Sequence, residues 1–442
     1  RGNARQARAP GDATRAIHRS PWAGGAIILL ALFSFGLIQP GDGTTVFLIL
    51  LALAAVGYFA TLRQIAKGLR PSGRALLACA VLAAAWRVPL LLLPPEPAAD
   101  LRRYVWDAHL VRAGLSPYRV VPADPAFAHL RTVENWPVNN PDVPSPYPPG
   151  AQLFFLAATA VHESALAIKV AALICDALLA FVVWRWLGAT GANPGWVLAY
   201  LWNPLVSLEV ARHGHVDVVG TLCLALAALA LVRGRSLLAS VGFALSVAVK
   251  PLPIVLLPLF WRRISRRDLA AGIAVLIALY LPFWDGRGFP IGSVPQVVER
   301  FRFNGPIFAA LASGAGPAAA AALATVVGLT AAALARRWLS VASPQGWAWP
   351  MAATLLCAPL VYPWYLVWLT PFVAGAAMIP IAIWTVSILI TYVVWQLPAG
   401  QWAVPQWALL VEYGALLVAA WWLLWRRKQV TARSASYSTP PA

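Results

Sequence analysis

Residues 45–62, TVFLILLALAAVGYFATL, and residues 75–93, ALLACAVLAAAWRVPLLLL, lie on either side of the basic segment RQIAKGLRPSGR at positions 63–74. Each apolar stretch is close to the roughly 20 residues that a helix needs to cross the hydrocarbon core of a bilayer. Cytoplasmic loops of membrane proteins are enriched in Lys and Arg, so the basic segment is typical of a cytoplasmic turn. The pattern predicts two membrane-spanning helices joined on the cytoplasmic side.

The composition of the whole chain agrees with this interpretation. Of the 442 residues, 60% are hydrophobic and only 11% are charged, whereas soluble domains carry about 25% charged residues. A soluble enzyme of this size and an intrinsically disordered chain are therefore excluded. The net charge of +18 would suggest nucleic-acid binding in a soluble protein. Here the arginines form short clusters between apolar runs, which is the distribution of a protein that crosses the membrane several times.

Apolar runs of near-spanning length recur along the chain. They lie at about 23–39, 45–62, 75–93, 166–184, 194–210, 215–232, 236–249, 251–261, 267–283, 318–335, 347–361, 364–379, 380–396 and 406–425. We expect an all-α polytopic membrane protein, a helix bundle with about 12–14 transmembrane helices within residues 23–426. The basic residues 1–22 and residues 427–442 are expected to be cytoplasmic tails.

Two segments do not fit a plain succession of spans. If residues 150–161 crossed the membrane, Arg185 would leave the cytoplasm, so this stretch is interpreted as an interfacial or re-entrant helix. Residues 236–261 lie between two basic clusters but are too short for two full spans. They predict a pair of short or broken helices that turn near Lys250 and Pro251. Irregular backbone at membrane depth is tolerated only where it lines protein or a wet cavity, so this turn is a candidate site.

Two large loops are expected outside the cytoplasm, at residues 94–165, with interfacial helices, and at residues 284–306. The first 56 residues of the first loop hold six of the chain's 16 acidic residues, namely Glu96, Asp100, Asp107, Asp124, Glu134 and Asp142. An acid at the membrane boundary can act as a general base when partial desolvation raises its pKa. Asp100 and Asp107 share a face if their segment is helical. The alternative for Asp100 is a structural role as a helix N-cap with a salt bridge to Arg103.

A second group of polar residues lies in WNPLVSLEVARHGHVD at 202–217, where one apolar run meets the next. Ionisable groups in or beside membrane spans are costly, so Glu209, His213, His215 and Asp217 are functional candidates. His215 and Asp217 could bind a metal ion, but a His-x-Asp pair without further ligands does not predict a metal site. Hydrogen bonding to a sugar or phosphate is at least as compatible with these residues, and we predict no metal.

The segment VKPLPIVLLPL at 249–259 contains Lys250, one of only four lysines in the chain. A lysine in an apolar stretch needs an anionic partner, and a lipid phosphate is a natural one. The alternative is that its ammonium group snorkels to the interface. Arg302 in the second loop is an exposed cation.

Two aromatic segments, SPYPPGAQLFF at 145–155 and YPWYLVWLTPF at 362–372, complete the set of motifs. Their aromatic side chains, including Tyr147, Trp364 and Tyr365, either belong to an interfacial belt or serve as platforms for sugar rings.

The segment DLRRYVWDAHLVRAGLSPY at 100–118 and the four segments at 145–155, 202–217, 249–259 and 362–372 follow one another in this order along the chain. The set resembles the polytopic GT-C glycosyltransferases of the family 87 type, which include phosphatidylinositol-mannoside mannosyltransferases and depend on polyprenyl-phosphate sugars. This resemblance implies a GT-C type helix bundle whose long first extracytoplasmic loop is catalytic.

The resemblance also implies an activity. It is the transfer of a hexose, usually mannose, from a polyprenyl-phosphate donor to a hydroxyl of a lipid or glycan acceptor on the extracytoplasmic side of a bacterial plasma membrane. The acid of the first loop is the catalytic base in such enzymes, which implies Asp100. Relatives often have two adjacent acids there, whereas this chain has Ala99 before Asp100. The GHxD stretch carries over to His215 and Asp217, and the membrane lysine carries over to Lys250.

A polyprenyl phosphate is an adequate leaving group, so the reaction needs a base for the acceptor hydroxyl and cations for the departing phosphate. We therefore expect single displacement with inversion. Lys250, Arg103 and Arg302 are the expected contacts of the donor phosphate. The expected substrate contacts are Asp107, Tyr104, His213, His215, Asp217, Glu209, Tyr147, Trp364 and Tyr365. No cofactor is expected, and the expected partners are the lipid-linked donor, a glycolipid or glycan acceptor and membrane lipids, without nucleic acid.

Two other functions share some of these features. A polyprenyl-diphosphate glycan ligase or polymerase would rely on extracytoplasmic arginines to hold a diphosphate, and the first loop offers several. A lipid or solute transporter would share the broken helices, but it should show an internal repeat of its halves, which the sequence lacks.

Overall fold

The computed structural model describes residues 21–35, 43–96, 99–286, 288–397 and 403–437. Within these ranges the chain is all-α, as predicted, and contains no strand apart from one isolated parallel bridge between Phe303 and Leu360. The predicted N-terminal tail lies almost entirely outside the described residues. The predicted C-terminal tail begins inside helix α19 (Gln406–Tyr437), which continues without interruption past residue 426.

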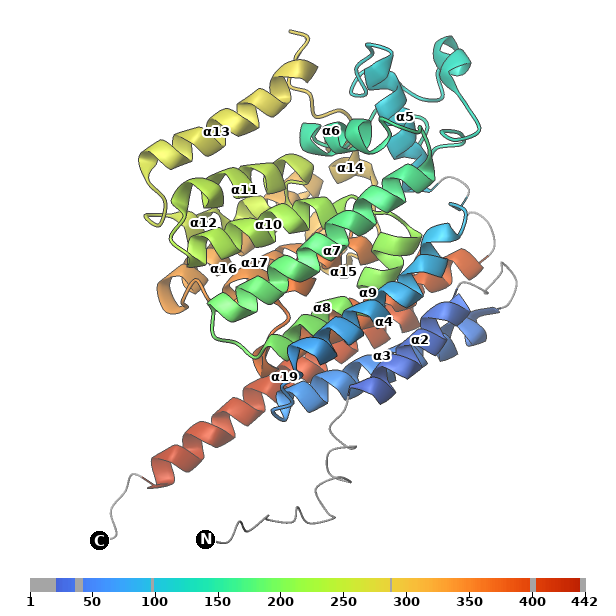
Figure 1. The fold of residues 1–442 in the computed structure, drawn as a ribbon. Helices are drawn as coiled ribbons and strands as arrows, with labels where there is room; N and C mark the ends of the chain where they lie inside the picture. Colours follow the sequence, from blue (N-terminus) through green and yellow to red (C-terminus); the bar gives the residue numbers. More distant parts are fainter. Residues whose placement is uncertain (1–20, 36–42, 97–98, 287, 398–402, 438–442) are drawn as a thin grey trace, which may run out of the picture.

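Six helical segments of the described residues are long and apolar enough to cross a bilayer. Four are continuous helices: α3 (Gly43–Ala66), α4 (Gly73–Leu92), α7 (Ala165–Ala189) and α16 (Pro317–Trp338). The fifth is the first part of α19. The sixth joins η7 (Ala376–Met378), α18 (Ile379–Ser387) and most of η8 (Ile388–Gln396). Six is fewer than the predicted number, because several apolar runs fold as short or interrupted helices. Figure 1 shows α3, α4, α7 and α19 running in a similar diagonal direction.

The shorter apolar helices pack against the long ones or against one another. They are α2 (Trp22–Phe35), α10 (Asp217–Val232), α11 (Ser236–Val249), α13 (Arg266–Tyr280) with its extension η5 (Leu281–Phe283), α15 (Pro306–Ala315) and α17 (Pro344–Leu356). The expected turn after residue 249 is confirmed. Helix α11 ends there, Lys250 is extended, and only the short elements η4 (Leu252–Leu256) and α12 (Leu257–Phe260) follow.

Two apolar runs that were expected to be plain spans are interrupted by proline. The first is divided into η2 (Pro194–Val197), α8 (Leu198–Leu201), α9 (Pro204–Val206) and the π-helix η3 (Ser207–Arg212). At this break the Asn203 side chain accepts from the Leu205 amide, which satisfies one backbone donor, and it donates to the Thr385 hydroxyl. The second run forms the 3-10 helix η6 (Pro363–Phe372). A proline lacks the amide hydrogen that continues a helix, so neither run forms one continuous α-helix.

The two predicted loops lie against each other at one end of the molecule. The first contains α5 (Asp100–Arg112), η1 (Pro125–Leu130) and α6 (Pro149–Ala158), and the second contains α14 (Val294–Arg300). They are joined by an ion pair of 3.0 Å between Arg119 and Asp285 and by a hydrogen bond of 2.8 Å from Ser293 to the Pro144 carbonyl. Helix α6 has ten residues, which is too short to cross the membrane. In Figure 1, α5 and α6 lie above α7 at the upper right.

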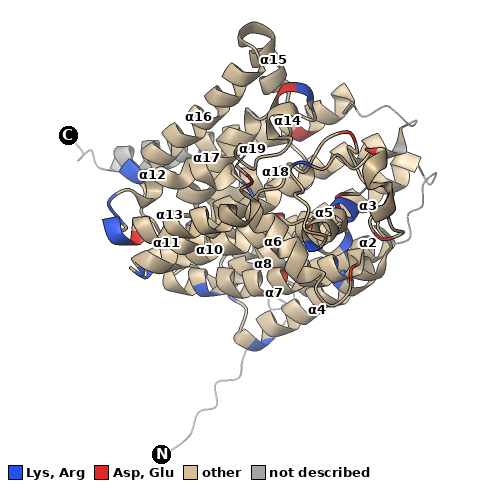
Figure 2. Cartoon of the chain, turned by 90° about the horizontal axis from the view of Figure 1, so that it is seen from above, with Lys and Arg blue, Asp and Glu red and all other residues tan. Residues whose placement is uncertain are grey.

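The basic turns lie together at the other end of the bundle. Three hydrogen bonds connect neighbouring turns: Asn193 to the Leu69 carbonyl, Ser236 to Asp268, and Arg336 to the Trp261 carbonyl. Figure 2 shows a basic turn beside α12 and α13, and it shows both acidic and basic residues around α5 and α14. The contacts between the basic turns agree with the expectation that these clusters face the same compartment.

Close contact between helices is made by small residues. Gly24 of α2 and Gly57 of α3 face each other, and a Cβ atom built on Gly57 would lie 2.6 Å from the Gly24 carbonyl oxygen. Small residues let helix backbones approach closely, which supplies the packing energy that lipid-exposed helices cannot obtain from the hydrophobic effect.

Gly57→Ala is therefore expected to lower stability by about 1–3 kcal/mol, because the added methyl group overpacks this crossing. The matched control is Gly414→Ala in α19, where an added Cβ would meet no atom within 4 Å. That variant should be neutral or slightly stabilising, since Ala is favoured over Gly in helices. Thermal unfolding of both variants in one detergent measures the difference, and equal melting temperatures would contradict the proposed contact.

Candidate active site

Asp100 lies at the first position of α5, with its carboxylate facing the inside of the molecule. Ala99 is the N-cap residue, and Arg103 pairs with Asp107, so neither structural role considered for Asp100 is observed. One carboxylate oxygen of Asp100 accepts a hydrogen bond from Asn139, and the other lies 3.6 Å from His215 Nδ1. Asp100 is thus held by neutral or weakly basic groups and stays available for chemistry.

Burial is the main electrostatic influence on Asp100. It raises the pKa of this carboxyl above the ordinary value, although the charge of Lys250 and hydrogen bonds with Tyr147 and Asn139 act in the opposite direction. A raised pKa makes a carboxylate a stronger proton acceptor, which is the property required of a general base.

The second charged group of the site is an ion pair between the partly buried Lys250 and the buried Asp217. Lys250 Nζ donates to Asp217 Oδ1 at 2.7 Å, and the indole nitrogen of Trp368 donates to the same oxygen at 2.7 Å. The ammonium group also lies 3.9 Å from the centre of the Tyr365 ring. The anion that Lys250 requires is therefore supplied by Asp217. The second oxygen, Asp217 Oδ2, is buried and has no hydrogen-bond partner among the described residues.

An aromatic stack forms one side of the cluster. The Trp364 ring stacks on His215 with 4.1 Å between ring centres, and Tyr362 stacks on Trp364 at 4.4 Å. Phe303 of the second loop extends the stack beyond Tyr362. The sequence left open whether Trp364 belonged to an interfacial belt, and the structure places it against a candidate site residue.

Helix α5 contributes a second aromatic group. Tyr104 OH lies 3.5 Å from His215 Nδ1, and its ring stacks on Phe155 of α6 and contacts the edge of Tyr147. Gly150 allows this arrangement, because a Cβ atom there would lie 2.7 Å from the Ala248 carbonyl at the end of α11. Helix α6 therefore rests directly on the helix end that precedes Lys250.

Glu209 and His213 lie behind His215. Glu209 Oε2 is 3.4 Å from His215 Nε2 and 3.4 Å from His213 Nδ1, and Tyr392 donates to the other carboxylate oxygen. Three aromatic or amide residues of the site, Asn139, Trp368 and Tyr392, were not singled out from the sequence. Trp368 lies in a motif that was quoted, whereas Tyr392 lies in an ordinary apolar run and Asn139 in an irregular loop.

The structure does not bring three predicted residues to this cluster. Arg103 and Asp107 pair at 3.1 Å, both are buried, and the arginine also donates to the Val143 carbonyl. Asp107 further accepts from Ser145 and Gln152. Arg302 donates to the carbonyls at the end of α14 and lies over the Phe308 ring.

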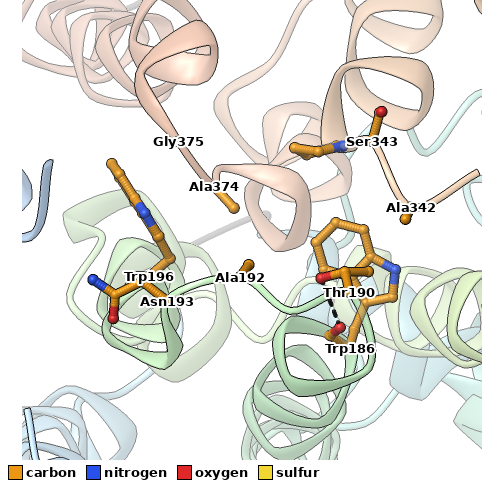
Figure 3. Close-up of a pocket in the computed structure, with 10 residues that line it drawn as sticks. Trp186, Thr190, Ala192, Asn193, Trp196, Ala342, Ser343, Ala374 and Gly375 are labelled. Carbon is orange, nitrogen blue, oxygen red and sulfur yellow. Dashed lines mark hydrogen bonds between the residues drawn. The ribbon is translucent and has the colours of Figure 1, made fainter. Parts of the chain in front are cut away.

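A separate cavity of about 430 Å³ lies at the opposite end of α7, shown in Figure 3. Trp186, Thr190 and Asn193 line one wall, and Ser343 and Gly375 lie on the other side. None of its ten lining residues is charged. The cavity is lined by residues near the C-terminal end of α7 and shares no residue with the Asp100 cluster, so it is not part of the candidate active site.

Comparison with known proteins identifies a relationship for the first part of the chain. A family model described as "Alpha-(1->6)-mannopyranosyltransferase, N-terminal domain" matches residues 20–264. The match includes Asp100, His215, Asp217 and Lys250 and ends before the aromatic stack. No curated protein and no solved structure matches the chain.

Arg103→Met is expected to destabilise the first loop, because it leaves the buried Asp107 carboxylate without its cation. Removing one partner of a buried ion pair costs about 3–5 kcal/mol. The double variant Arg103→Met/Asp107→Leu removes both charges and should recover part of the loss. Thermal unfolding and limited proteolysis within residues 94–164 measure the effect. If Arg103 instead contacted the donor phosphate, the single variant would keep normal stability and lose donor affinity.

Proposed function

Because the chain belongs to the alpha-(1->6)-mannopyranosyltransferase family, we propose that it transfers mannose from a polyprenyl-phosphate donor to a lipid or glycan hydroxyl on the extracytoplasmic side of the membrane. The family relationship shows that the chain is a membrane glycosyltransferase. The lipid-linked donor, the reaction mechanism and the side of the membrane on which transfer takes place are what we propose. The observation that carries it is the position of Asp100, whose carboxylate lies 3.6 Å from His215 Nδ1 and whose pKa is affected by the charges of Lys250 and Asp217.

In the proposed reaction, Asp100 accepts the proton of the acceptor hydroxyl while the hydroxyl oxygen attacks the anomeric carbon. The bond from that carbon to the phosphate oxygen breaks, and the phosphate leaves with the electron pair. Single displacement inverts the configuration, so an α product requires a β-linked donor. No covalent intermediate is needed, because general-base catalysis and stabilisation of the departing phosphate are sufficient.

Lys250 and Asp217 are the proposed donor contacts. An ammonium group has three N–H donors, and only one of them is occupied by Asp217, so the others remain for phosphate oxygens. The unpartnered Asp217 Oδ2 can accept a sugar hydroxyl. Trp364 and Tyr365 supply flat apolar surfaces beside these polar groups, which suits the C–H face of a hexose. Arg103 and Arg302 have no part in this proposal, since both are engaged elsewhere.

The proposed side of the membrane follows from charge. The basic turns lie at the end of the bundle away from α5, and such clusters face the cytoplasm in most membrane proteins. A diphosphate-dependent ligase is less well supported, because the two loop arginines predicted beside the site are bound to other groups. A transporter would leave the family relationship and the buried acid without a role.

Asp100→Asn is expected to keep the fold and the affinity for the donor but to lower the transfer rate by about 10²–10⁴-fold, because an amide cannot accept the proton. Transfer of labelled mannose from polyprenyl-phosphate mannose to extracted membrane lipids measures the rate. Asp142→Asn, which changes an exposed carboxylate of the same loop, is the matched control and should be active. A fully active Asp100→Asn protein would remove Asp100 from the mechanism.

The pH dependence of kcat/KM gives a second test of the base. The base must be ionised, and its pKa is raised by burial, so activity should fall at acidic pH with an apparent pKa above the ordinary aspartate value. The hydrogen bond from Asn139 lowers this pKa. Asn139→Ala should therefore move the acidic limb to higher pH. An unchanged limb would show that another group controls the ionisation.

A further inference from the structure

The strongest unexplained feature of the molecule is the arrangement of Glu209, His213 and His215 next to Asp100. Each offers one ligand atom, and these atoms all lie within 4.8 Å of one another. We propose that these three side chains bind one divalent transition-metal ion, with Zn²⁺ the favoured ion. The proposal concerns metal binding and the orientation of His215, and it does not depend on which sugar is transferred.

Two of the three distances within the group match the spacing of ligands around a metal ion, and all three ligand atoms lie within 4.8 Å of one another. Glu209 Oε2 lies 3.4 Å from His213 Nδ1 and 3.4 Å from His215 Nε2. Hydrogen bonds between N–H and oxygen are most frequent at about 2.9–3.0 Å, so both contacts are long for that purpose. Two ligands of a tetrahedral zinc ion, each at about 2.1 Å, are separated by about 3.4 Å.

The chemistry of the three ligands indicates the class of ion. Two imidazole nitrogens and one carboxylate, with a fourth position left for another molecule, are the ligand set of many mononuclear zinc sites. Calcium and magnesium prefer ligand sets made of oxygen. His215 and Asp217 were weighed as a metal pair from the sequence, but Asp217 is bound to Lys250, and Glu209 takes its place as the carboxylate ligand.

The local backbone explains how the three ligands converge. Glu209 lies in the π-helix η3, and the His215 amide bonds back to the Glu209 carbonyl at 3.0 Å. The intervening Gly214 has a φ of 62°, a left-handed conformation that favours glycine. This reversal returns the chain so that both histidines face the same carboxylate. Single π-turns inside helices are frequent at functional sites.

The groups around the three ligands hold them as the groups around a metal site do. Tyr392 donates to Glu209 Oε1 and leaves Oε2 for the ion, while Trp364 fixes the ring plane of His215. The other ring nitrogen of His215, Nδ1, lies 3.6 Å from Asp100. A carboxylate beside the second nitrogen of a metal-bound histidine is a common arrangement. Binding through Nε2 would keep the proton on Nδ1, where it faces the carboxylate of Asp100.

Metal content and metal affinity test the proposal. The full-length protein is purified in detergent with a tag that contains no histidine, stripped with a chelator and then titrated with Zn²⁺ against a chromophoric chelator. The wild-type protein should bind one Zn²⁺ per chain and gain thermal stability from it, because an ion that binds only the folded state raises the melting temperature. Co²⁺ in the same site should give the intense visible absorption of a tetrahedral complex.

Variants locate the ion. Glu209→Gln and His213→Ala should each weaken Zn²⁺ binding by at least about 100-fold and abolish the thermal shift. The matched control is His109→Ala, because His109 and Glu163 form a histidine–glutamate pair at 2.8 Å that belongs to no three-ligand group among the described residues. His109→Ala should bind Zn²⁺ as the wild-type protein does. Asp100→Asn should also retain the ion, which separates a failure of this proposal from a failure of the proposed catalytic base.

Two outcomes would overturn the proposal. The first is that the wild-type protein, which needs no variant to fold, binds neither Zn²⁺ nor Co²⁺ in stoichiometric amount at neutral pH. The second is that Glu209→Gln and His213→Ala bind Zn²⁺ as tightly as His109→Ala does, which would place any bound ion elsewhere.

Discussion

The rest of the structure depends on how the backbone polar groups are satisfied where helices break inside an apolar bundle. A carbonyl or amide without a partner costs several kcal/mol in hydrocarbon, so a break is possible only where a side chain replaces the lost bond. Asn203 does so at the start of the segment that leads to the π-helix. Lys169 does so at the end of α4, where its ammonium group donates to the carbonyls of Leu90 and Leu93. The candidate site is built on backbone that these two residues make possible.

The same constraint accounts for the buried charges away from the site. Arg87 of α4 pairs with Asp176 of α7 at 2.8 Å and also donates to the Leu201 carbonyl, which lies immediately before the Asn203 break. Tyr200 donates to the same aspartate. The Arg87–Asp176 pair therefore joins α4, α7 and the proline-interrupted segment that contains Tyr200 and Leu201. Its charges hold these helices together and take no part in the proposed reaction. Two buried side chains of opposite charge that are also hydrogen-bonded can be accommodated in a low-dielectric interior, whereas a single buried charge without a partner strongly destabilises the fold.

Features of the structure that depend on residues close together in the sequence were predicted, whereas contacts between residues far apart in the sequence were not. The long apolar helices and the turn at Lys250 follow from run length and from the position of basic clusters, which are properties of neighbouring residues. The partners of Arg103 and Arg302 were not predictable, because the first loop folds back on itself and α14 captures its own arginine. The contribution of Tyr392 could not be predicted either, since one hydroxyl in an apolar run gives no sign that it meets Glu209, 183 positions earlier.

The order of the site residues along the chain has a consequence for biosynthesis. Glu209 and Asp217 are synthesised long before Tyr392 and Trp368, which donate hydrogen bonds to these two buried acids. Proteins fold from the N-terminus during synthesis, so a growing chain carries these acids into the membrane before their last partners exist. A nascent chain that stops short of its final helices therefore exposes unsatisfied polar groups to lipid. The two parts of the chain on either side of residue 264 therefore depend on each other for the hydrogen bonding of these buried acids.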